Sequence, residues 1–199
     1  MEELSDLIKK QRPVSTPIAP WILSRWSPRS MSGEPLTQEE VQALFEAARY
    51  APSSYNAQPW RFVFALKNDP VWDKYLDLLV DFNKSWCKNA SMLVILCSRK
   101  TFEHSGKPSQ THSFDAGAAW MNLALQGSHL GLVVHGLQGL DYQKAAHLAE
   151  VPSEFQVEAM IAVGKKAPKE SLPPDLQAME QISTRRPLSE IVFHGTFSR

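Results

Sequence analysis

Two arginines four positions apart, with a serine between them, form the first segment whose residue types could bind a ligand. In residues 24–29 the guanidinium groups of Arg25 and Arg29 flank the hydroxyl of Ser27. Arginine makes strong and directional hydrogen bonds to phosphate, so this spacing suits one phosphate group. Taken alone, an ordinary solvated loop is the better interpretation of the segment.

A second segment, residues 51–60, combines hydroxyls, side-chain amides, prolines and aromatic residues. Its hydroxyls belong to Ser53 and Ser54, and its amides to Asn56 and Gln58. Amide side chains carry both donors and acceptors, so they can match the alternating polar edge of a heteroaromatic ring. A purely structural turn has the same composition, and composition alone does not separate the two interpretations.

Two further segments could complete such a site. The glycine of Leu137-Gln138-Gly139 lets a backbone N–H group approach a planar ligand closely. Arg185 and Arg186 offer a second contact to phosphate, although arginines in a tail usually face water. Together the segments indicate a nucleotide-like ligand, with cations for its phosphate and amides for its ring.

Composition excludes several other classes of protein. Lys+Arg and Asp+Glu both number 21, and this balance argues against a nucleic-acid binder or a polybasic membrane protein. The six histidines have no metal-ligand spacing, and no P-loop, Rossmann, zinc-protease or nucleophile-elbow motif occurs. Cys87 and Cys97 are too few for a disulfide framework and are typical of small buried hydrophobes.

Length and hydropathy predict one domain over residues 1–199 in the cytoplasm. The longest apolar run, residues 92–97, is far shorter than the roughly 20 residues of a membrane span. The first residues are acidic and lack the apolar stretch of a signal peptide. Residues 1–24 form a proline-containing arm and residues 165–199 a C-terminal extension. Neither segment carries its own core, so each needs another surface.

Hydrophobic periodicity predicts the elements that position these residues. Thr37 and Glu40 fit a capping box, and apolar residues at helical spacing follow, so we expect a helix to about Tyr50. The apolar run 92–97 is typical of a strand covered on both faces. Other helices are expected at 2–10, 71–79, 114–130 and 141–150, other strands at 61–66 and 157–163, and a turn at 131–139. Helices and strands interleave, which predicts an α+β fold.

From about residue 23 to residue 193 the chain resembles the FMN-dependent nitroreductase family. The most specific element is the Pro-Ser-Ser-x-Asn-x-Gln-Pro-Trp loop at 52–60, between a helix and a strand. The other matching motifs are Arg25-x-Ser27-x-Arg29, Asp115-x-Gly117-Ala118 with Asn122-Leu123, Gly131-Leu132, Leu137-x-Gly139, Ala162-Val163-Gly164 and Arg185-Arg186-Pro187-Leu188.

The resemblance implies a mostly antiparallel sheet flanked by helices in an intertwined homodimer, with two FMN molecules at the interface. Helix 113–130 would form the dimer seam, and a strand near 191–193 would reach the partner's sheet. NAD(P)H would deliver hydride to the flavin N5, and a small electron acceptor such as a nitro compound or quinone would then collect it, by a ping-pong mechanism. Because the flavin carries this chemistry, no protein acid or base is nominated.

The resemblance also assigns the cofactor site. Arginines would hold the phosphate, the 52–58 loop of the partner would hold the polar edge of the ring, and the backbone N–H groups of Gln138 and Gly139 would lie near N5. The full expected set is Arg25, Trp26, Ser27, Arg29, Pro52, Ser53, Ser54, Asn56, Gln58, Leu137, Gln138, Gly139 and, with one residue of slip allowed, Arg185 or Arg186.

Three features depart from the family pattern. Trp26 stands where many relatives have Arg or His, and Gln138 stands where several have Glu, which removes a carboxylate near the site. The stretch between residues 94 and 115 is too short for the lid-like insertion of larger relatives.

Other functions remain open from the sequence. A flavin-dependent dehydrogenase or oxidase acting on a specific metabolite would use the same residues, as would a non-catalytic flavin-binding domain. A flavin-free α+β protein would require all the motifs to coincide by chance. Nothing in the sequence selects NADH over NADPH, because there is no Rossmann unit to read the ribose.

Overall fold

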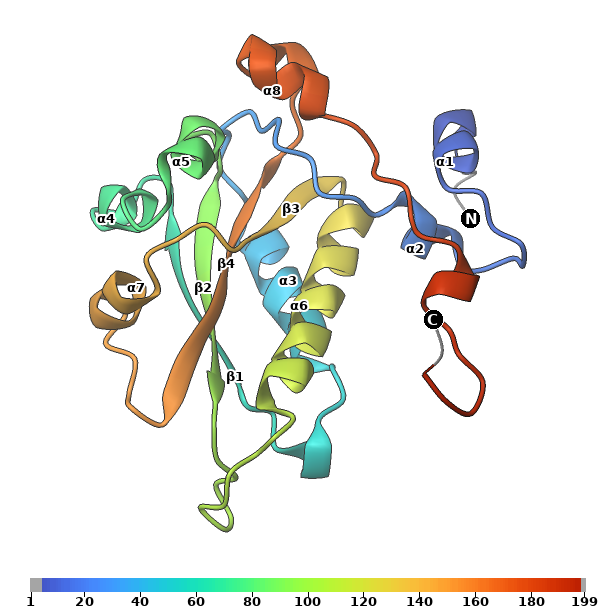
Figure 1. Cartoon of the computed structure of the whole chain (residues 1–199). Coiled ribbons are helices and arrows are strands. Elements are labelled where there is room, and N and C mark those ends of the chain that lie inside the picture. The colour runs from blue at the N-terminus through green and yellow to red at the C-terminus, as the bar shows by residue number, and fades with distance from the viewer. Residues whose placement is uncertain (1–4, 198–199) are drawn as a thin grey trace.

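A four-stranded antiparallel sheet forms the centre of the structure, a computed structural model that describes residues 5–197 (Figure 1). Its strand order is β1-β2-β4-β3. The strands are β1 (Trp60–Leu66), β2 (Met92–Arg99), β3 (Leu132–Leu137) and β4 (Phe155–Lys165). The predicted α+β class and antiparallel sheet are confirmed, as are the strands expected at 61–66, 92–97 and 157–163.

Helices cover both faces of the sheet, and β2 shows why. Every residue of β2 from Met92 to Ser98 is buried. Successive side chains of a strand point to opposite faces. The helices that cover the sheet are α3 (Gln38–Arg49), α4 (Trp72–Leu76), α5 (Asp81–Cys87), α6 (His112–His129) and α7 (Tyr142–Leu148). Val94 packs on one face, in the core cluster under α3 and α6, and Ile95 packs on the other face, in the core cluster under α4, α5 and α7.

Local sequence signals place α3 as expected. The Thr37 side chain accepts a hydrogen bond from the Glu40 amide at 3.1 Å, and the Glu40 carboxylate accepts one from the Thr37 amide at 2.7 Å. This reciprocal pair satisfies two amides that the helix itself leaves without acceptors.

The small residues of α6 serve the core of this chain. Ala116, Ala119 and Ala124 are buried on the sheet-facing side of the helix. A Cβ atom added to Gly127 would lie 2.2 Å from the Val134 side chain, so the close approach of α6 to β3 needs glycine there.

One strand was missed because its glycines were interpreted as turn residues. Gly131 has a φ of +73° and does form a turn. Gly136, by contrast, lies inside β3, where an added Cβ would sit 3.2 Å from the Trp120 ring. The expected turn at 131–139 is therefore wrong, because residues 132–137 form β3. Gly136 is needed there to make room for the Trp120 ring and does not form a turn.

Three helices were also missed: α2 (Pro20–Ser24), α5 and, in the tail, α8 (Pro174–Met179). α2 interrupts the arm that was expected to be extended, with Pro20 in the first turn, where a missing N–H costs nothing. The helix expected at 71–79 ends earlier, as α4, and α5 follows it. The sequence of α5 is mostly polar, so it lacks the apolar residues at helical spacing from which a helix is predicted.

The two ends of the chain lie together beside the sheet (Figure 1). The helix expected at 2–10 is α1 (Asp6–Gln11), and residues 2–4 lie outside the described residues. The strand expected near 191–193 is not formed within this chain, where Ile191 and Val192 are exposed. The remaining elements are η1 (Ser54–Asn56), η2 (Lys169–Ser171) and η3 (Leu188–Glu190).

Both thiols are buried, as the sequence predicts. Burial raises the pKa of Cys87, and burial together with the charge of Glu158 raises the pKa of Cys97 to about 11. Thiols are nucleophilic as thiolates, so neither is suited to redox chemistry. Among residues 5–197, no helix is both long and apolar enough to cross a bilayer.

Candidate functional site

Three guanidinium groups converge where the arm meets the tail. Arg12 is buried and donates to the carbonyl oxygens of Leu23 and Arg25, each at 2.7 Å, and of Ser183 at 3.0 Å. Arg185 donates to the Ser183 hydroxyl at 2.8 Å. Burial first, and then the charge of Arg185, lowers the pKa of both Arg12 and Arg25. Within the described part of the chain no Asp or Glu forms an ion pair with these three arginines, so the cluster is suited to an anion.

The other two arginines expected at this site have different partners. Arg29 donates its backbone N–H to the Glu180 carboxylate at 2.9 and 3.0 Å, and its buried Nε has no hydrogen-bond partner. Arg186 forms an ion pair with Glu190 at 3.7 Å. The geometry therefore places Arg185, and not Arg186, beside Arg25. Trp26 and Ser27 are half-buried, and Ser27 accepts a bond from Arg25 at 3.3 Å.

A second group of polar atoms surrounds His135 on β3. The His135 Nδ1 atom lies 2.8 Å from the Pro28 carbonyl oxygen, and the Trp86 ring lies 4.8 Å from the imidazole. The Nε1 atom of Trp86 is buried without a hydrogen-bond partner, like the Nε atom of Arg29. Buried donors are normally satisfied, so two unsatisfied donors near one histidine indicate a missing acceptor.

We expect His135 to make the stability of the protein depend on pH. Burial, with the charges of Arg29 and Arg25, lowers the pKa of His135 below its ordinary value. The unfolded chain therefore binds this proton more tightly than the folded chain. The contribution of the neutral imidazole is complete above about pH 6.5 and declines as the pH falls below that value, by at most about 1.4 kcal/mol per pH unit.

His135→Gln isolates this effect, because glutamine keeps a donor for the Pro28 carbonyl and does not titrate. The difference in unfolding free energy between wild type and His135→Gln, measured in urea between pH 8 and pH 5, should shrink as the pH falls. A difference that stays constant over this range would contradict the assignment.

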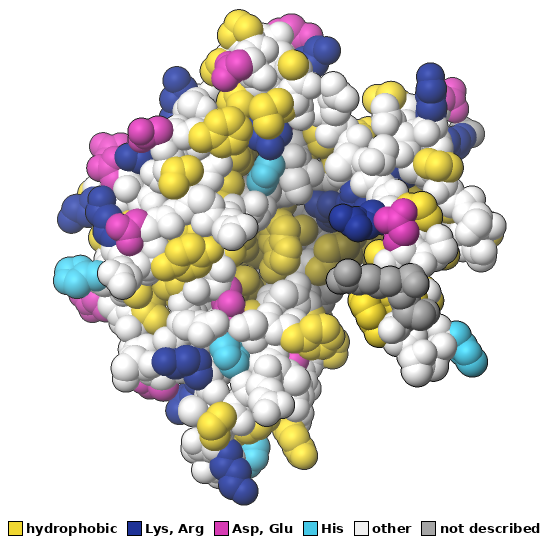
Figure 2. Space-filling view, viewed as in Figure 1, with side chains coloured by type: hydrophobic (Ala, Val, Ile, Leu, Met, Phe, Trp, Pro, Cys, Tyr) yellow, Lys and Arg dark blue, Asp and Glu magenta, His cyan; other side chains and the backbone are white. Residues whose placement is uncertain are grey.

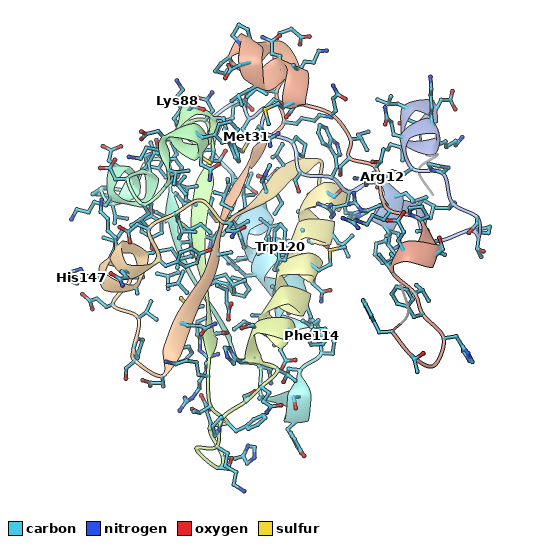
Figure 3. The ribbon with its side chains drawn as sticks, in the orientation of Figure 1. Arg12, Met31, Lys88, Phe114, Trp120 and His147 are labelled. Carbon is cyan, nitrogen blue, oxygen red and sulfur yellow. The ribbon has the colours of Figure 1, made fainter. Side chains whose placement is uncertain are left out.

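A cavity of about 500 Å³ opens between α6, α7, the end of β3 and the middle of β4. Its volume is within the range of small-molecule sites, roughly 300–1,000 Å³. Figure 2 shows a hollow with hydrophobic side chains on its floor and basic side chains at its margin, and Figure 3 places Trp120 in it. The lining residues are Leu96, Ser113, Gly117, Trp120, Gly136, Leu137, Gln138, Tyr142, Glu158, Ala159 and Ile161.

The segment after β3 reaches this cavity. Within residues 5–197, the backbone N–H groups of Gln138 and Gly139 have no hydrogen-bond acceptor. The structure gives a reason for Gly139 that the sequence analysis did not consider. An added Cβ would lie 2.8 Å from side-chain atoms of both Asn83 and Val80, so packing of α5 already requires glycine there.

The 52–59 loop adopts a strained backbone. Tyr55, Asn56 and Gln58 have φ values of 52°, 52° and 46°, in the left-handed region that most residues avoid. The Ser54 amide donates to the buried Asp115 carboxylate at 3.1 Å, which ties the loop to the first turn of α6. Strain of this kind persists where the surroundings hold it, and it concentrates at functional sites.

Within one chain the loop and the arginine cluster lie apart. α6 has 18 residues, a length of about 27 Å. The loop adjoins its first turn, whereas the arm and tail lie toward its other end (Figure 1). A single chain therefore does not bring Pro52, Ser53, Ser54, Asn56 or Gln58 to the arginines.

Sequence reasoning missed four residues around the site. Arg12 lies in the arm, where no periodicity or motif marks it, and Trp86 and Asn83 lie on the unpredicted helix α5. Glu158 lies on β4 and lines the cavity. Its charge interrupts the apolar pattern of that strand, and this interruption was the sequence signal that could have identified it.

Comparison with known proteins identifies the family. The family model for the nitroreductase family matches residues 22–85. A crystal structure of an oxidoreductase containing FMN is similar over 94% of this chain and 96% of its own, with 43% sequence identity and a TM-score of 0.90. The chain belongs to the nitroreductase family.

Relatives within the nitroreductase family differ in how much they share with the chain. An oxygen-insensitive NADPH nitroreductase of Helicobacter acinonychis is 42% identical over 34% of this chain, and the chain spans only 31% of that protein. Protein DrgA of Synechocystis is 29% identical over 66% of this chain and 75% of its own length. A chain from Desulfovibrio desulfuricans, solved in complex with FMN, has 26% identity and a TM-score of 0.71 over 93% of this chain and all of its own.

Proposed function

We propose that this nitroreductase-family chain is an FMN-dependent oxidoreductase that moves hydride from NAD(P)H to a small electron-poor acceptor, such as a nitro compound or a quinone. One observation carries the proposal. Arg12, Arg25 and Arg185 form an anion site with which no carboxylate of residues 5–197 forms an ion pair, and an open cavity adjoins β3. Basic side chains lie at the margin of this hollow, on the same face of the molecule (Figure 2). A planar ligand that bears a phosphate fits this arrangement, because its phosphate suits the arginines and its ring suits the cavity. The cytoplasmic location stays a prediction.

The residues present fit FMN on the evidence of their unsatisfied groups. The arginine cluster would hold the phosphate. The N–H groups of Gln138 and Gly139, beside the cavity, would donate to acceptors of the ring. Relatives with 43% and 26% identity contain FMN, which supports the same cofactor here.

A homodimer is part of the proposal. The strained 52–59 loop lies away from the arginines of its own chain, so a second copy would have to bring its loop to them. The exposed Ile191 and Val192 in the tail supply apolar surface that association would bury. These features support a site shared by two subunits.

The chemistry follows from this arrangement. When bound, FMN supplies hydride transfer at its N5 atom. The arginines would orient the cofactor through its phosphate, and the backbone N–H groups of Gln138 and Gly139 would favour negative charge on the ring as it develops. One cavity serves both nicotinamide and acceptor, so they would occupy it in turn, which is a ping-pong scheme.

The absorption spectrum of the purified protein tests the proposal. We expect flavin bands that bleach on anaerobic addition of NADPH or NADH and return when a quinone is added. Bands that persist with both nicotinamides would instead favour a flavin enzyme for a specific metabolite, or a non-catalytic flavin domain. A colourless protein that takes up no added FMN would overturn the proposal.

A further inference from the structure

The cavity carries one charged side chain, Glu158, among its described lining residues. Glu158 lies on β4 beyond the end of β3, next to a register shift that follows Leu96 on the neighbouring β2. Its side chain retains 19% of its exposure, so it is partly desolvated but reachable from the cavity. A charge in such a place interacts with a ligand more strongly than a charge on the open surface.

Several donors hold one oxygen of this carboxylate. Oε1 accepts hydrogen bonds from the hydroxyl of Ser98, from the hydroxyl of Ser113 at 2.8 Å and from the Gln156 amide at 3.0 Å. All hydrogen bonds that Glu158 accepts within the described residues are made to Oε1. The side chain is thus fixed in position, and Oε2 remains for another donor.

Donor counting assigns the protons of this network. Ser98 has a single hydroxyl hydrogen, which it donates to Glu158. The Ser98 oxygen lies 2.7 Å from the His112 Nδ1 atom, so Nδ1 carries a hydrogen and donates to Ser98. No Lys or Arg in the described residues pairs with Glu158. Its carboxylate is therefore held by hydroxyl and amide donors, and the His112 Nδ1 atom lies 3.5 Å from Oε1.

We propose that Glu158 selects the electron acceptors of this cavity by charge, favouring planar acceptors that carry an ammonium or similar cationic group over anionic ones. The proposal rests on the function proposed above. Oε2 accepts a hydrogen bond from the cationic group of the ligand, whereas an anionic group meets the negative charge of Glu158, with which no Lys or Arg of residues 5–197 forms an ion pair. Like charges brought together in a partly desolvated site cost binding energy.

Three nitroaromatics of matched shape test this selection in the FMN-loaded protein. They are 4-nitrobenzylamine, a cation at neutral pH, the neutral 4-nitrobenzyl alcohol and the anionic 4-nitrobenzoate. Glu158→Gln keeps the size of the side chain and an acceptor for Ser113, and removes the charge. We expect the kcat/KM ratio of the cation to the anion to fall at least about 10-fold, through KM, with the neutral compound changing less than about twofold.

Matched variants separate this role from a structural one. Glu154→Gln removes an exposed carboxylate from the turn before β4 and should leave the ratio unchanged. Glu158→Asp keeps the charge and should retain a preference for the cation. A ratio that is the same in wild type and Glu158→Gln, or one that Glu154→Gln lowers equally, would overturn the proposal.

A binding experiment keeps the test independent of turnover. Benzylamine and benzoate, which are not reduced, can be titrated against the quenching of Trp120 fluorescence, with Trp120→Phe identifying the signal. We expect wild type to bind benzylamine more tightly and Glu158→Gln to lose that preference. If turnover of both nitroaromatics and a quinone is absent while this preference is present, the proposed function fails, and Glu158 still selects the ligands of the cavity by charge. Absence of any preference in wild type overturns the role of Glu158.

Discussion

Replacing Arg185 by alanine should weaken FMN binding by about 10- to 100-fold, because a hydrogen bond to a charged group is worth about 1.5–3 kcal/mol. Arg185 lies beside Arg12 and Arg25, where no carboxylate competes for its guanidinium among the described residues. The neighbouring Arg186 is the matched control. It pairs with Glu190, so Arg186→Ala should change FMN affinity less than about twofold.

Titration of flavin-stripped protein with FMN, followed by quenching of flavin fluorescence, measures both affinities. Raising the salt concentration should weaken FMN binding to wild type more than to Arg185→Ala, because the variant has one charge fewer for the phosphate. Equal effects of the two alanine variants, or a larger effect of Arg186→Ala, would show that the anion site has been assigned to the wrong arginine.

Leu93→Ala should lower the free energy of unfolding by about 2–5 kcal/mol, which is the range for removing a leucine side chain from a packed core. Leu93 is fully buried on β2, opposite Ala65 of β1 and Ala162 of β4. The sheet holds the backbone on both sides, so the neighbours of the deleted side chain cannot collapse into the space. At this chain length the loss corresponds to a fall in Tm of roughly 4–20 °C.

Leu7→Ala provides the comparison, since Leu7 retains 58% of its exposure on α1. Its effect should stay within about 0.5 kcal/mol. Urea unfolding followed by circular dichroism measures both variants. A Leu93→Ala protein as stable as Leu7→Ala would mean that β2 is not the central strand of a close-packed sheet.

Local sequence determined the elements whose signals are contained in a few consecutive residues. The capping box of Thr37 and Glu40 marks the start of α3, and the uninterrupted apolar run at 92–97 marks a strand buried on both faces. The Pro-Ser-Ser-x-Asn-x-Gln-Pro-Trp loop led to the family, which the comparisons confirm. The roles expected for individual cofactor-binding residues stay predictions.

Only the tertiary structure decided which residues surround the site. Arg12 meets Ser183 across 171 positions of the chain, and Glu158 meets Ser98 across 60. Periodicity reports which face of an element is apolar, and it carries no information about which distant polar groups meet. For the same reason two adjacent arginines, equivalent in sequence, separate in space: Arg185 turns toward Arg25, and Arg186 turns toward Glu190. The sequence by itself predicted a site for a phosphate-bearing ligand, and the packing of the arm against the tail determined which arginines that site contains.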